Sequence, residues 1–583
     1  MRRKVIGPWC MWLLMLPLLA AVMWRPPAAS TQEVGNLACP GEEVFFDPGN
    51  GEDILVPPGY TIEVFAAGLN FPAGIAFRGA PDSFEVFVTE AGASLPGRCN
   101  DAAFFEAQTS VPAAENPFLS QVRVLDNHGT PLRALGRPPA VAQRADPSVL
   151  HSPTIGITFE REFQGGRLFA SDSLQSARAA NSSRIVELDP TTGALTALIT
   201  GLPTGDHPTE QLAVRDGVIF WSQGSATNSG VVGHDNAIPE QHDIPCQDVI
   251  LSGNNFDSGD GHVTGGFLPH GVPGAAGQVV PAFSGATQPG ICTGAILQAR
   301  LDDPQRTIEP ASWGYRNPFG LRFAPSNHPL KGALLVSENG EDERGARPVN
   351  NAPDRLHVTR VTREGLDYHG WPDLFGFLES TQRVFNPIGG PSDDNPDAVV
   401  GQPIQPVLLV PPQPPVAPLA LAPADVAVVG LDFAPAAFVG GGNPGDLVEQ
   451  GDALIAREGD FGFSLPNGEP EEGHDAMRVH FLKDGRLHTE RFVFNCRAGD
   501  QVVEPDGRKR CTQPADQAFA EQIHGINRPV DGKFGPDGAF YLVDFGAVRD
   551  NGQSDPRTQF RNPEDKPFVQ IPGTGVIWRI RKR

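Results

Sequence analysis

One pattern recurs six times along this chain of 583 residues: an alternating apolar run, a turn, and a second alternating apolar run. Period-2 alternation is typical of a strand with one buried face, and a turn between two such runs predicts a β-hairpin. The six copies are "FPAGIAFRGAPDSFEVFVTEAG" (71–92), "SPTIGITFEREFQGGRLFASDS" (152–173), "TEQLAVRDGVIFWSQGS" (209–225), "NPFGLRFAPSNHPLKGALLVSENG" (317–340), "DVAVVGLDFAPAAFVGGGNPGDLVEQGDALIAREG" (425–459) and "NRPVDGKFGPDGAFYLVDFG" (527–546).

Six copies of one hairpin predict an all-β fold, a six-bladed β-propeller. The copies are unevenly spaced, so the loops between blades are expected to carry long insertions. One insertion, 386–423, is Pro-rich, and part of it is expected to be extended without regular pairing. The 66 glycines and 58 prolines argue against a helical protein, because both residues break helices. The alternative is a coincidental series of hairpins in an array of β-sandwiches.

The N-terminus is predicted to be an export signal, because basic residues precede an apolar segment (7–24) and a stretch of small residues. We place the signal at 1–29, an N-terminal extension at 30–54 and the propeller domain at 55–583. An uncleaved anchor is the alternative. No membrane span is expected after the signal, and the protein is expected in the periplasm or outside the cell.

Cysteine usage agrees with export. Cys10 lies in the signal, and the remaining six cysteines are an even number, as expected for disulfides in an oxidising compartment. Proximity along the chain suggests the pairs Cys39–Cys99, Cys246–Cys292 and Cys496–Cys511. The formal charge of −24 argues against a nucleic-acid partner, because phosphate binding needs basic patches.

Four polar segments lie at the ends of predicted blade strands, where loops line the central mouth of a propeller. His207 precedes one strand, and an imidazole can accept a proton from an alcohol. Arg316 and Asn317 precede another, where a guanidinium can bind carboxylates through two parallel contacts. Segment 337–356 combines carboxylates and turn residues, whose oxygens suit calcium. Arg528 precedes the last hairpin. The structural alternatives are a solvated loop histidine and interblade salt bridges.

Several motifs, taken together and in this order, resemble the glucose/sorbosone dehydrogenase family of soluble quinoprotein sugar dehydrogenases, which have a six-bladed propeller. The resemblance covers roughly residues 55–380 and 425–583. The motifs are "VPPGYTIEVFAAGLNFPAGIAF", "DHPTEQLAV", "GVIFWSQGSATN", "WGYRNPFGL", "LLVSENGEDERGARPVNNAPDRL", "GLDYHGWPD" and "NRPVDGKFGPDGAFYLVD".

The resemblance implies two cofactors, pyrroloquinoline quinone (PQQ) and calcium. By position, His207 matches the family's general base. The residues that match cofactor contacts are Arg316, Asn317 and Arg528 for the quinone, and Gly340 and Glu341, through their backbone carbonyls, for calcium. The implied reaction oxidises a sugar or a related aldehyde or alcohol, with hydride passing to the quinone and the proton to the histidine. An external electron acceptor is then needed, because the chain has no C-x-x-C-H haem motif.

Two positions depart from the family's pattern. Where the glucose-oxidising members have an aspartate that supports the base, this chain has Ser225. Where they have a lysine near the cofactor, it offers Arg457 or Glu458. Two other functions therefore stay open. One is a propeller without redox activity that binds carbohydrate or protein through its loops, and the other is a calcium-dependent lactonase-like hydrolase.

Overall fold

The computed structural model describes residues 32–583 except 234–235, 237, 239–240, 260, 362–364, 388–400, 444–445, 460–472, 483–484, 514–521 and 551–567. The predicted signal (1–29) and the first part of the Pro-rich insertion therefore lie outside the described residues. The described chain is almost entirely strands and loops, with one α-helix, α1 (Ala102–Thr109). The predicted all-β class is thus confirmed. No helix in these ranges is long and apolar enough to cross a membrane.

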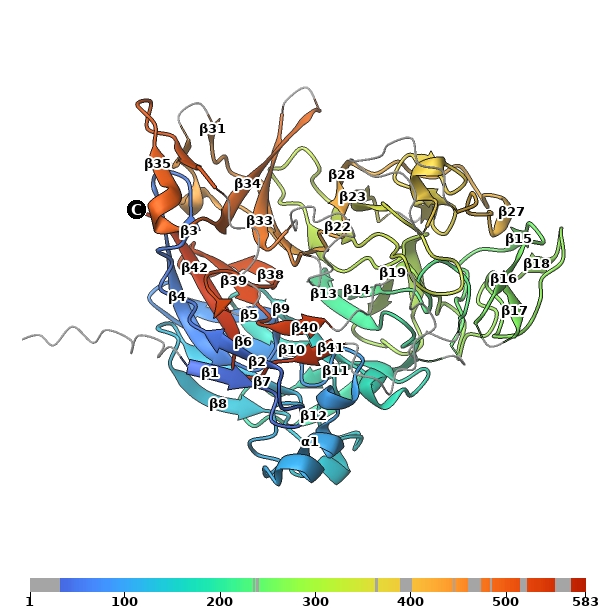
Figure 1. Ribbon diagram of the computed structural model, residues 1–583, viewed down its shortest axis with the longest axis horizontal. Coiled ribbons are helices and arrows are strands. Elements are labelled where there is room, and N and C mark those ends of the chain that lie inside the picture. The colour runs from blue at the N-terminus through green and yellow to red at the C-terminus, as the bar shows by residue number, and fades with distance from the viewer. Residues whose placement is uncertain are drawn as a thin grey trace, which may run out of the picture.

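Six sheets of four or five strands, almost all antiparallel, make up most of the described structure (Figure 1). The first three sheets follow one another along the chain. They consist of β5 (Pro72–Ala80), β6 (Ser83–Glu90), β7 (Gln121–Asp126) and β8 (Pro131–Leu135); of β9 (Thr154–Arg161), β10 (Gly165–Asp172), β11 (Ser183–Leu188) and β12 (Leu195–Leu202); and of β13 (Thr209–Arg215), β14 (Val218–Gln223), β19 (Ala295–Arg300), β20 (Glu309–Trp313) and β24 (Asp367–Tyr368).

The other three sheets continue in the same order, and two of them gain an outer strand from the N-terminal part of the chain. They consist of β21 (Leu321–Phe323), β22 (Leu334–Glu338), β23 (Pro353–Thr359) and β28 (Ala420–Ala424); of β29 (Val428–Phe433), β32 (Ala453–Arg457), β33 (Asp475–Phe481), β34 (Leu487–Asn495) and β3 (Ile54–Leu55); and of β38 (Pro529–Phe534), β39 (Phe540–Asp544), β42 (Gly575–Lys582) and β4 (Tyr60–Leu69).

The six predicted hairpins are present, because the two strands of each pair directly with each other. The first strands of these hairpins also contact one another in sequence order, and the last of them contacts the first. These strands are β5, β9, β13, β21, β29 and β38. The six sheets therefore follow one another around a closed ring.

Glycines allow the first strands of neighbouring sheets to approach closely. A Cβ added at Gly74 would lie 2.4 Å from the carbonyl oxygen of Ile155 in the next sheet, and one at Gly156 would lie 2.3 Å from that of Glu210. Real Cβ atoms do not come this close to backbone atoms, so any side chain here would push the sheets apart.

The second strand of four of the six hairpins, β6, β10, β14 and β22, adds a hydrogen bond across the same junctions. A hydroxyl donates to a backbone carbonyl of the next sheet or of the residues that lead into it. A hydroxyl at this position gives a backbone carbonyl a hydrogen bond from the neighbouring sheet, which stabilises the junction. The four donor–acceptor pairs are Thr89 to Ile155, Ser171 to Glu210, Ser222 to Phe319 and Ser337 to Val429.

The ring is completed by strands from distant parts of the chain. Strand β4 pairs along its length with β42, from the Tyr60–Lys582 pair to the Leu69–Gly575 pair. The apolar faces of these strands lie in two large clusters of buried side chains, which include Trp578 and Ile580 in one and Tyr541 and Ile577 in the other. The last sheet is therefore built from both ends of the described chain.

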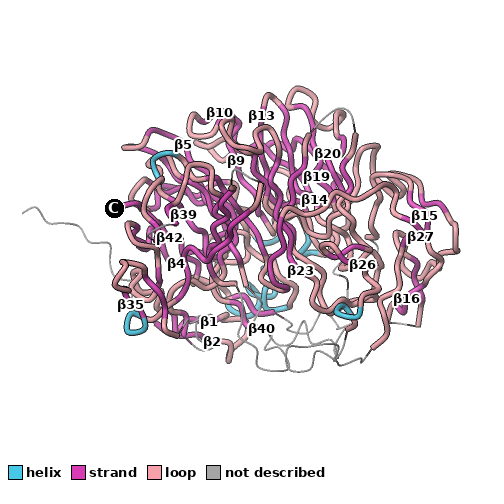
Figure 2. The backbone as a smooth tube through the Cα atoms, turned by 90° about the horizontal axis from the view of Figure 1, so that it is seen from above, coloured by secondary structure: helices cyan, strands magenta, loops and turns pink. Residues whose placement is uncertain are grey.

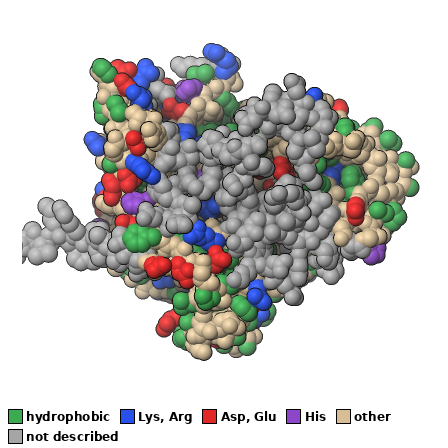
Figure 3. All heavy atoms as spheres, in the orientation of Figure 1, with side chains coloured by type: hydrophobic (Ala, Val, Ile, Leu, Met, Phe, Trp, Pro, Cys, Tyr) green, Lys and Arg blue, Asp and Glu red, His purple; other side chains and the backbone are tan. Residues whose placement is uncertain are grey.

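The loops between sheets carry small appended sheets. Strand β15 (Val249–Leu251) pairs with β18 (Val279–Val280) and with β27 (Leu408–Val410), which comes from the Pro-rich insertion. Together with β16 (Asn255–Asp257) and β17 (Val263–Gly265), these strands lie at the edge of the molecule far from β4 and β42 (Figures 1 and 2). This edge presents apolar side chains to solvent (Figure 3), among them Val263, Val279, Leu409 and Val410.

The remaining strands are short and form separate two- or three-stranded sheets. They are β1 (Gln32–Gly35), β2 (Glu43–Phe46), β25 (Leu374–Phe375), β26 (Leu378–Glu379), β30 (Gly442–Asn443), β31 (Asp446–Leu447), β35 (Gln501–Val503), β36 (Lys509–Cys511), β37 (Gln522–Ile523), β40 (Val548–Asp550) and β41 (Phe568–Gln570).

All three predicted disulfides are present, and they close loops of different lengths: Cys39–Cys99, Cys246–Cys292 and Cys496–Cys511. Replacing both Cys39 and Cys99 with serine is expected to lower the free energy of unfolding by about 2–4 kcal/mol, because the unfolded chain gains freedom. The matched change at Cys496 and Cys511 should cost less, since these residues are 15 positions apart rather than 60. Urea unfolding of both variants checks this, and a larger loss for the shorter loop would contradict it.

Candidate active site

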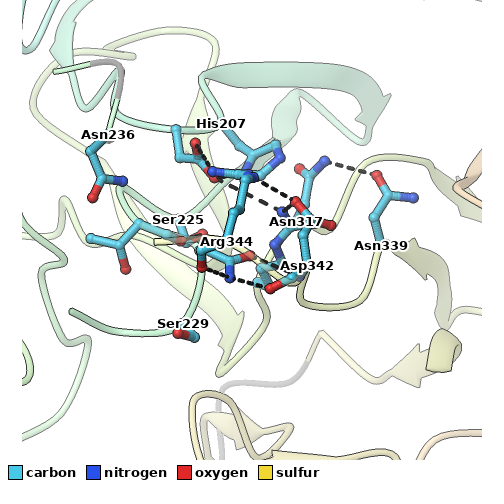
Figure 4. Close-up of polar contacts among 12 residues, drawn as sticks. His207, Ser225, Ser229, Asn236, Asn317, Asn339, Asp342 and Arg344 are labelled. Atoms are coloured by element: carbon cyan, nitrogen blue, oxygen red, sulfur yellow. Dashed lines mark hydrogen bonds and ion pairs between the residues drawn. The ribbon is translucent and has the colours of Figure 1, made fainter. Parts of the chain in front are cut away.

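Three of the loops singled out in the sequence meet through their backbones. The amide of His207, just before β13, donates to the carbonyl of Ser225 at 3.0 Å. The amide of Ser225, just after β14, donates to the carbonyl of Arg316 at 2.8 Å. The structure thus brings the predicted base and the first predicted quinone contact together. Figure 4 shows His207 in one cluster with Asp342 and Arg344.

Arg316 is buried at this junction, with only 3% of its side chain exposed. Its backbone amide donates to Glu338 at 2.6 Å, and its guanidinium donates to Asp342 at 2.5 Å and to the carbonyl of Gly340. The buried Nε has no hydrogen-bond partner among the described residues. The guanidinium is therefore fixed in place and still has one donor available.

Asn317, the second predicted quinone contact, lies beside Asn339, with 2.9 Å between its amide nitrogen and the Asn339 side-chain oxygen. In the exchanged amide orientation, the nitrogen of Asn317 instead lies 2.8 Å from a carboxyl oxygen of Glu210. Burial raises the pKa of Glu210 well above its usual range. Burial therefore favours the neutral form of Glu210 beside Arg316.

The two residues predicted to bind calcium lie next to the arginine. The carbonyl of Gly340 accepts the hydrogen bond from Arg316, and its amide donates to Asp354 at 2.7 Å. The side chain of Glu341 points elsewhere and binds Arg355 at 2.6 Å. The Gly340 carbonyl thus already attracts a cation, and a calcium ion there would have to displace the guanidinium.

Arg528 is linked to this region through a second carboxyl group, that of Glu458. Its backbone amide donates to Asp544 at 2.7 Å, and its guanidinium donates to the carbonyl of Gly459 at 3.4 Å. Burial raises the pKa of Glu458 to about 7, although Arg528 opposes the shift. Glu458 in turn raises the pKa of Glu210, so the two carboxyl groups lie near each other.

Arg457 and Glu458, the two residues that the sequence offers in place of the expected lysine, have different partners. Both nitrogens of the Arg457 fork bind Asp475 on the neighbouring strand β33, at 2.7 and 2.5 Å. Glu458, in contrast, is close enough to Arg528 for the arginine to lower its pKa. Between Arg457 and Glu458, the acidic residue is therefore the one that interacts with Arg528.

The sequence shows an aspartate beside the histidine, but sequence reasoning gave this residue no role. The carboxylate of Asp206 lies 3.4 Å from Nδ1 of His207. The hydroxyl of Ser225 donates to the carbonyl of Thr227 at 2.6 Å. Asp206, directly before the histidine, is therefore the carboxylate beside the imidazole, and Ser225 is hydrogen-bonded elsewhere. The adjacency of Asp206 to His207 in the sequence was the available signal.

Two arginines surround this pair. Arg344 donates to both oxygens of Asp206, at 3.0 and 2.7 Å, and to Asp342 at 2.9 Å. Burial would raise the pKa of Asp206, but Arg344, His207 and Arg316 together hold it below its usual value. Burial, assisted by Arg316 and Arg344, lowers the pKa of His207 to about 3. The imidazole is therefore neutral near pH 7 and able to accept a proton.

No protein-family model matches the chain, and no curated protein matches its sequence. Among solved structures, it is similar to the calcium structure of a Trichoderma reesei Carbohydrate-Active Enzymes Family AA12 protein (12% identity, TM-score 0.46, covering 91% of this chain and 98% of that one). It is also similar to the apo-form of the soluble aldose sugar dehydrogenase from Escherichia coli (12%, 0.43, 90% and 100%). A third is a putative oxidoreductase (glucose dehydrogenase) from Thermus thermophilus (15%, 0.42, 90% and 100%). All three TM-scores are low, so the function has to be inferred from the site.

Proposed function

We propose that the six sheets are the blades of a β-propeller that carries out PQQ-dependent oxidation of a sugar or a related aldehyde or alcohol. His207 is the general base of this reaction. The observation that carries the proposal is the meeting of His207, Ser225 and Arg316, which places a neutral imidazole beside a buried guanidinium.

The charges of the site fit an anionic cofactor. Arg316 interacts with Glu210 and Arg528 with Glu458, and burial raises the pKa of both carboxyl groups. PQQ is a tricarboxylate, and arginine forks bind carboxylates through paired hydrogen bonds. The buried Nε of Arg316, which lacks a partner in the described chain, is one donor for such a group. A bound quinone supplies the hydride acceptor that protein side chains lack.

The two ring nitrogens of His207 have different roles in this proposal. Nδ1 is buried and faces Asp206, whereas 18% of the whole side chain is exposed. Nε2 is therefore the nitrogen that accepts the hydroxyl proton of the substrate. The imidazolium formed in this step is stabilised by the carboxylates of Asp206 and Asp342.

The test is reconstitution of the purified protein with PQQ and calcium, followed by dye reduction with aldoses, sorbosone and simple aldehydes. We expect saturable quinone binding and substrate-dependent dye reduction, each weakened in an Arg316→Gln variant. The matched control is Arg300→Gln, which removes an arginine from an exposed ion pair with Asp302. Absence of both binding and dye reduction would reject the redox function and leave a propeller that binds carbohydrate or protein.

The low pKa of His207 predicts how the reaction responds to acid. A general base acts when it is deprotonated, so activity should fall only as the pH approaches the pKa of about 3. We expect kcat/KM to stay nearly constant between about pH 7 and pH 5, where an ordinary histidine of pKa near 6.5 becomes protonated. A fall centred near pH 6.5 would contradict the assigned environment of His207.

A further inference from the structure

We propose that Arg344 is a positioning residue that keeps Asp206 from hydrogen-bonding His207 and thereby sets the basicity of the general base. This inference rests on the proposed role of His207.

The first observation is the way Arg344 binds Asp206. Its guanidinium makes two parallel hydrogen bonds to the two carboxylate oxygens, at 3.0 and 2.7 Å. Both side chains are largely buried, with exposures of 12% and 9%. A two-point contact fixes the plane of a carboxylate as well as its position, which a lysine would not do. The orientation of Asp206 is therefore determined by Arg344.

The second observation is what this orientation does to the histidine. Asp206 is only 3.4 Å from Nδ1, yet Nδ1 is buried without a hydrogen-bond partner in the part of the chain that the structure describes. In a catalytic triad, the carboxylate accepts a hydrogen bond from Nδ1 and stabilises the imidazolium. Here that carboxylate is near enough to do so, but both of its oxygens accept hydrogen bonds from Arg344.

The third observation is that hydrogen bonds to the side chain of Asn228 fix the backbone of the loop that carries Arg344. The side chain of Asn228 accepts a hydrogen bond from the amide of Asp342 at 2.9 Å. It also donates to the carbonyls of Asp342 and Arg344, at 2.8 and 3.0 Å. These bonds tie the loop after β22 to the turn after β14. The contact between Arg344 and Asp206 is therefore built into the fold.

The charged groups around His207 come from three elements. Asp206 belongs to the same loop, Arg316 follows β20, and Asp342 and Arg344 follow β22. Removing Arg344 takes away one positive charge and frees the oxygens of Asp206 to bind Nδ1. Arg316 stays buried with Asp342, and its nearest nitrogen is 3.9 Å from Asp206. Both consequences make the imidazole more basic.

The experiment measures the pKa of His207 by NMR in the protein without quinone, using isotope-labelled histidine and a His207→Gln variant for assignment. We expect Arg344→Gln to raise this pKa by about one unit or more. Arg344→Lys keeps the charge but loses the two-point contact, and it should give a smaller rise. The matched control, Arg300→Gln, should leave the value unchanged.

A double variant separates positioning from simple charge. In Asp206→Asn/Arg344→Gln there is no carboxylate to bind Nδ1, so most of the rise should disappear. An unchanged pKa in both Arg344 variants, or an equal rise in the Asp206→Asn background, would overturn the proposal. Because the readout needs no quinone or substrate, a normal shift without dye reduction would reject only the oxidation. Dye reduction by the wild type without a shift in the variants would reject only the role of Arg344.

Discussion

Replacing His207 with alanine is expected to lower kcat by about 10²–10⁴-fold, the usual contribution of a general base, while quinone binding is retained. The imidazole is neutral near pH 7. Among the described residues, His207 is the histidine whose backbone is linked to that of Arg316 through Ser225. The side chains proposed to bind the quinone are on other loops, so the loss should appear in kcat.

The measurement is dye reduction in steady state alongside quinone titration by absorbance. His128 is an exposed histidine in a turn of the first sheet, so His128→Ala is the matched control and should behave like the wild type. A His207→Ala variant that binds quinone and keeps full turnover would show that another group removes the proton.

The second large effect is expected at Asp544, at the end of β39. Its buried carboxylate accepts hydrogen bonds from the amides of Asn527, Arg528 and Gly546 and from the indole of Trp578. Replacement by alanine leaves these donors unpaired, at a cost of about 1–3 kcal/mol for each that stays buried without water. We expect the free energy of unfolding to fall by about 3–6 kcal/mol, because such costs are not fully additive.

Urea unfolding measures this loss, and quinone titration measures its consequence for the site. Since Asp544 fixes the backbone of Arg528, the variant that remains folded should also bind PQQ more weakly. Asp537→Ala, at the exposed turn of the same hairpin, is the matched control and should cost much less. Equal destabilisation by the two changes would contradict the role of Asp544.

The hairpins could be predicted from the sequence because their signals are local. Alternation of apolar residues and a nearby turn specify each hairpin within about 20 residues, and all six were found in the structure. The pairing of β4 with β42 has no such signal, since two strands at opposite ends of the chain carry no shared local pattern. The pairing of the Pro-rich insertion could not be predicted either. Its sequence does not show that β27 pairs with β15 and β28 with β23.

From the sequence, only residues that a motif marks could be assigned to the candidate site. In the structure, His207 and Arg316 are linked through Ser225, Arg316 binds the Gly340 carbonyl, and Asn317 follows directly. The contacts of Asp206 and Arg344 were not predicted, for different reasons. Adjacent side chains can point in opposite directions, so the sequence could not show that Asp206 faces His207. The contact of Arg344 with Asp206 depends on the packing of two loops far apart in the chain.

The direction of the β4–β42 ladder determines how the ring would respond to force. Tyr60 lies opposite Lys582, so the segments leading out of the ring leave from the same end of the ladder. Tension applied directly at Tyr60 and Lys582 would load the hydrogen bonds of the ladder one pair at a time, beginning at that end. A ladder loaded in this order yields at lower force than one whose bonds are sheared together. The Leu69–Gly575 end would part last.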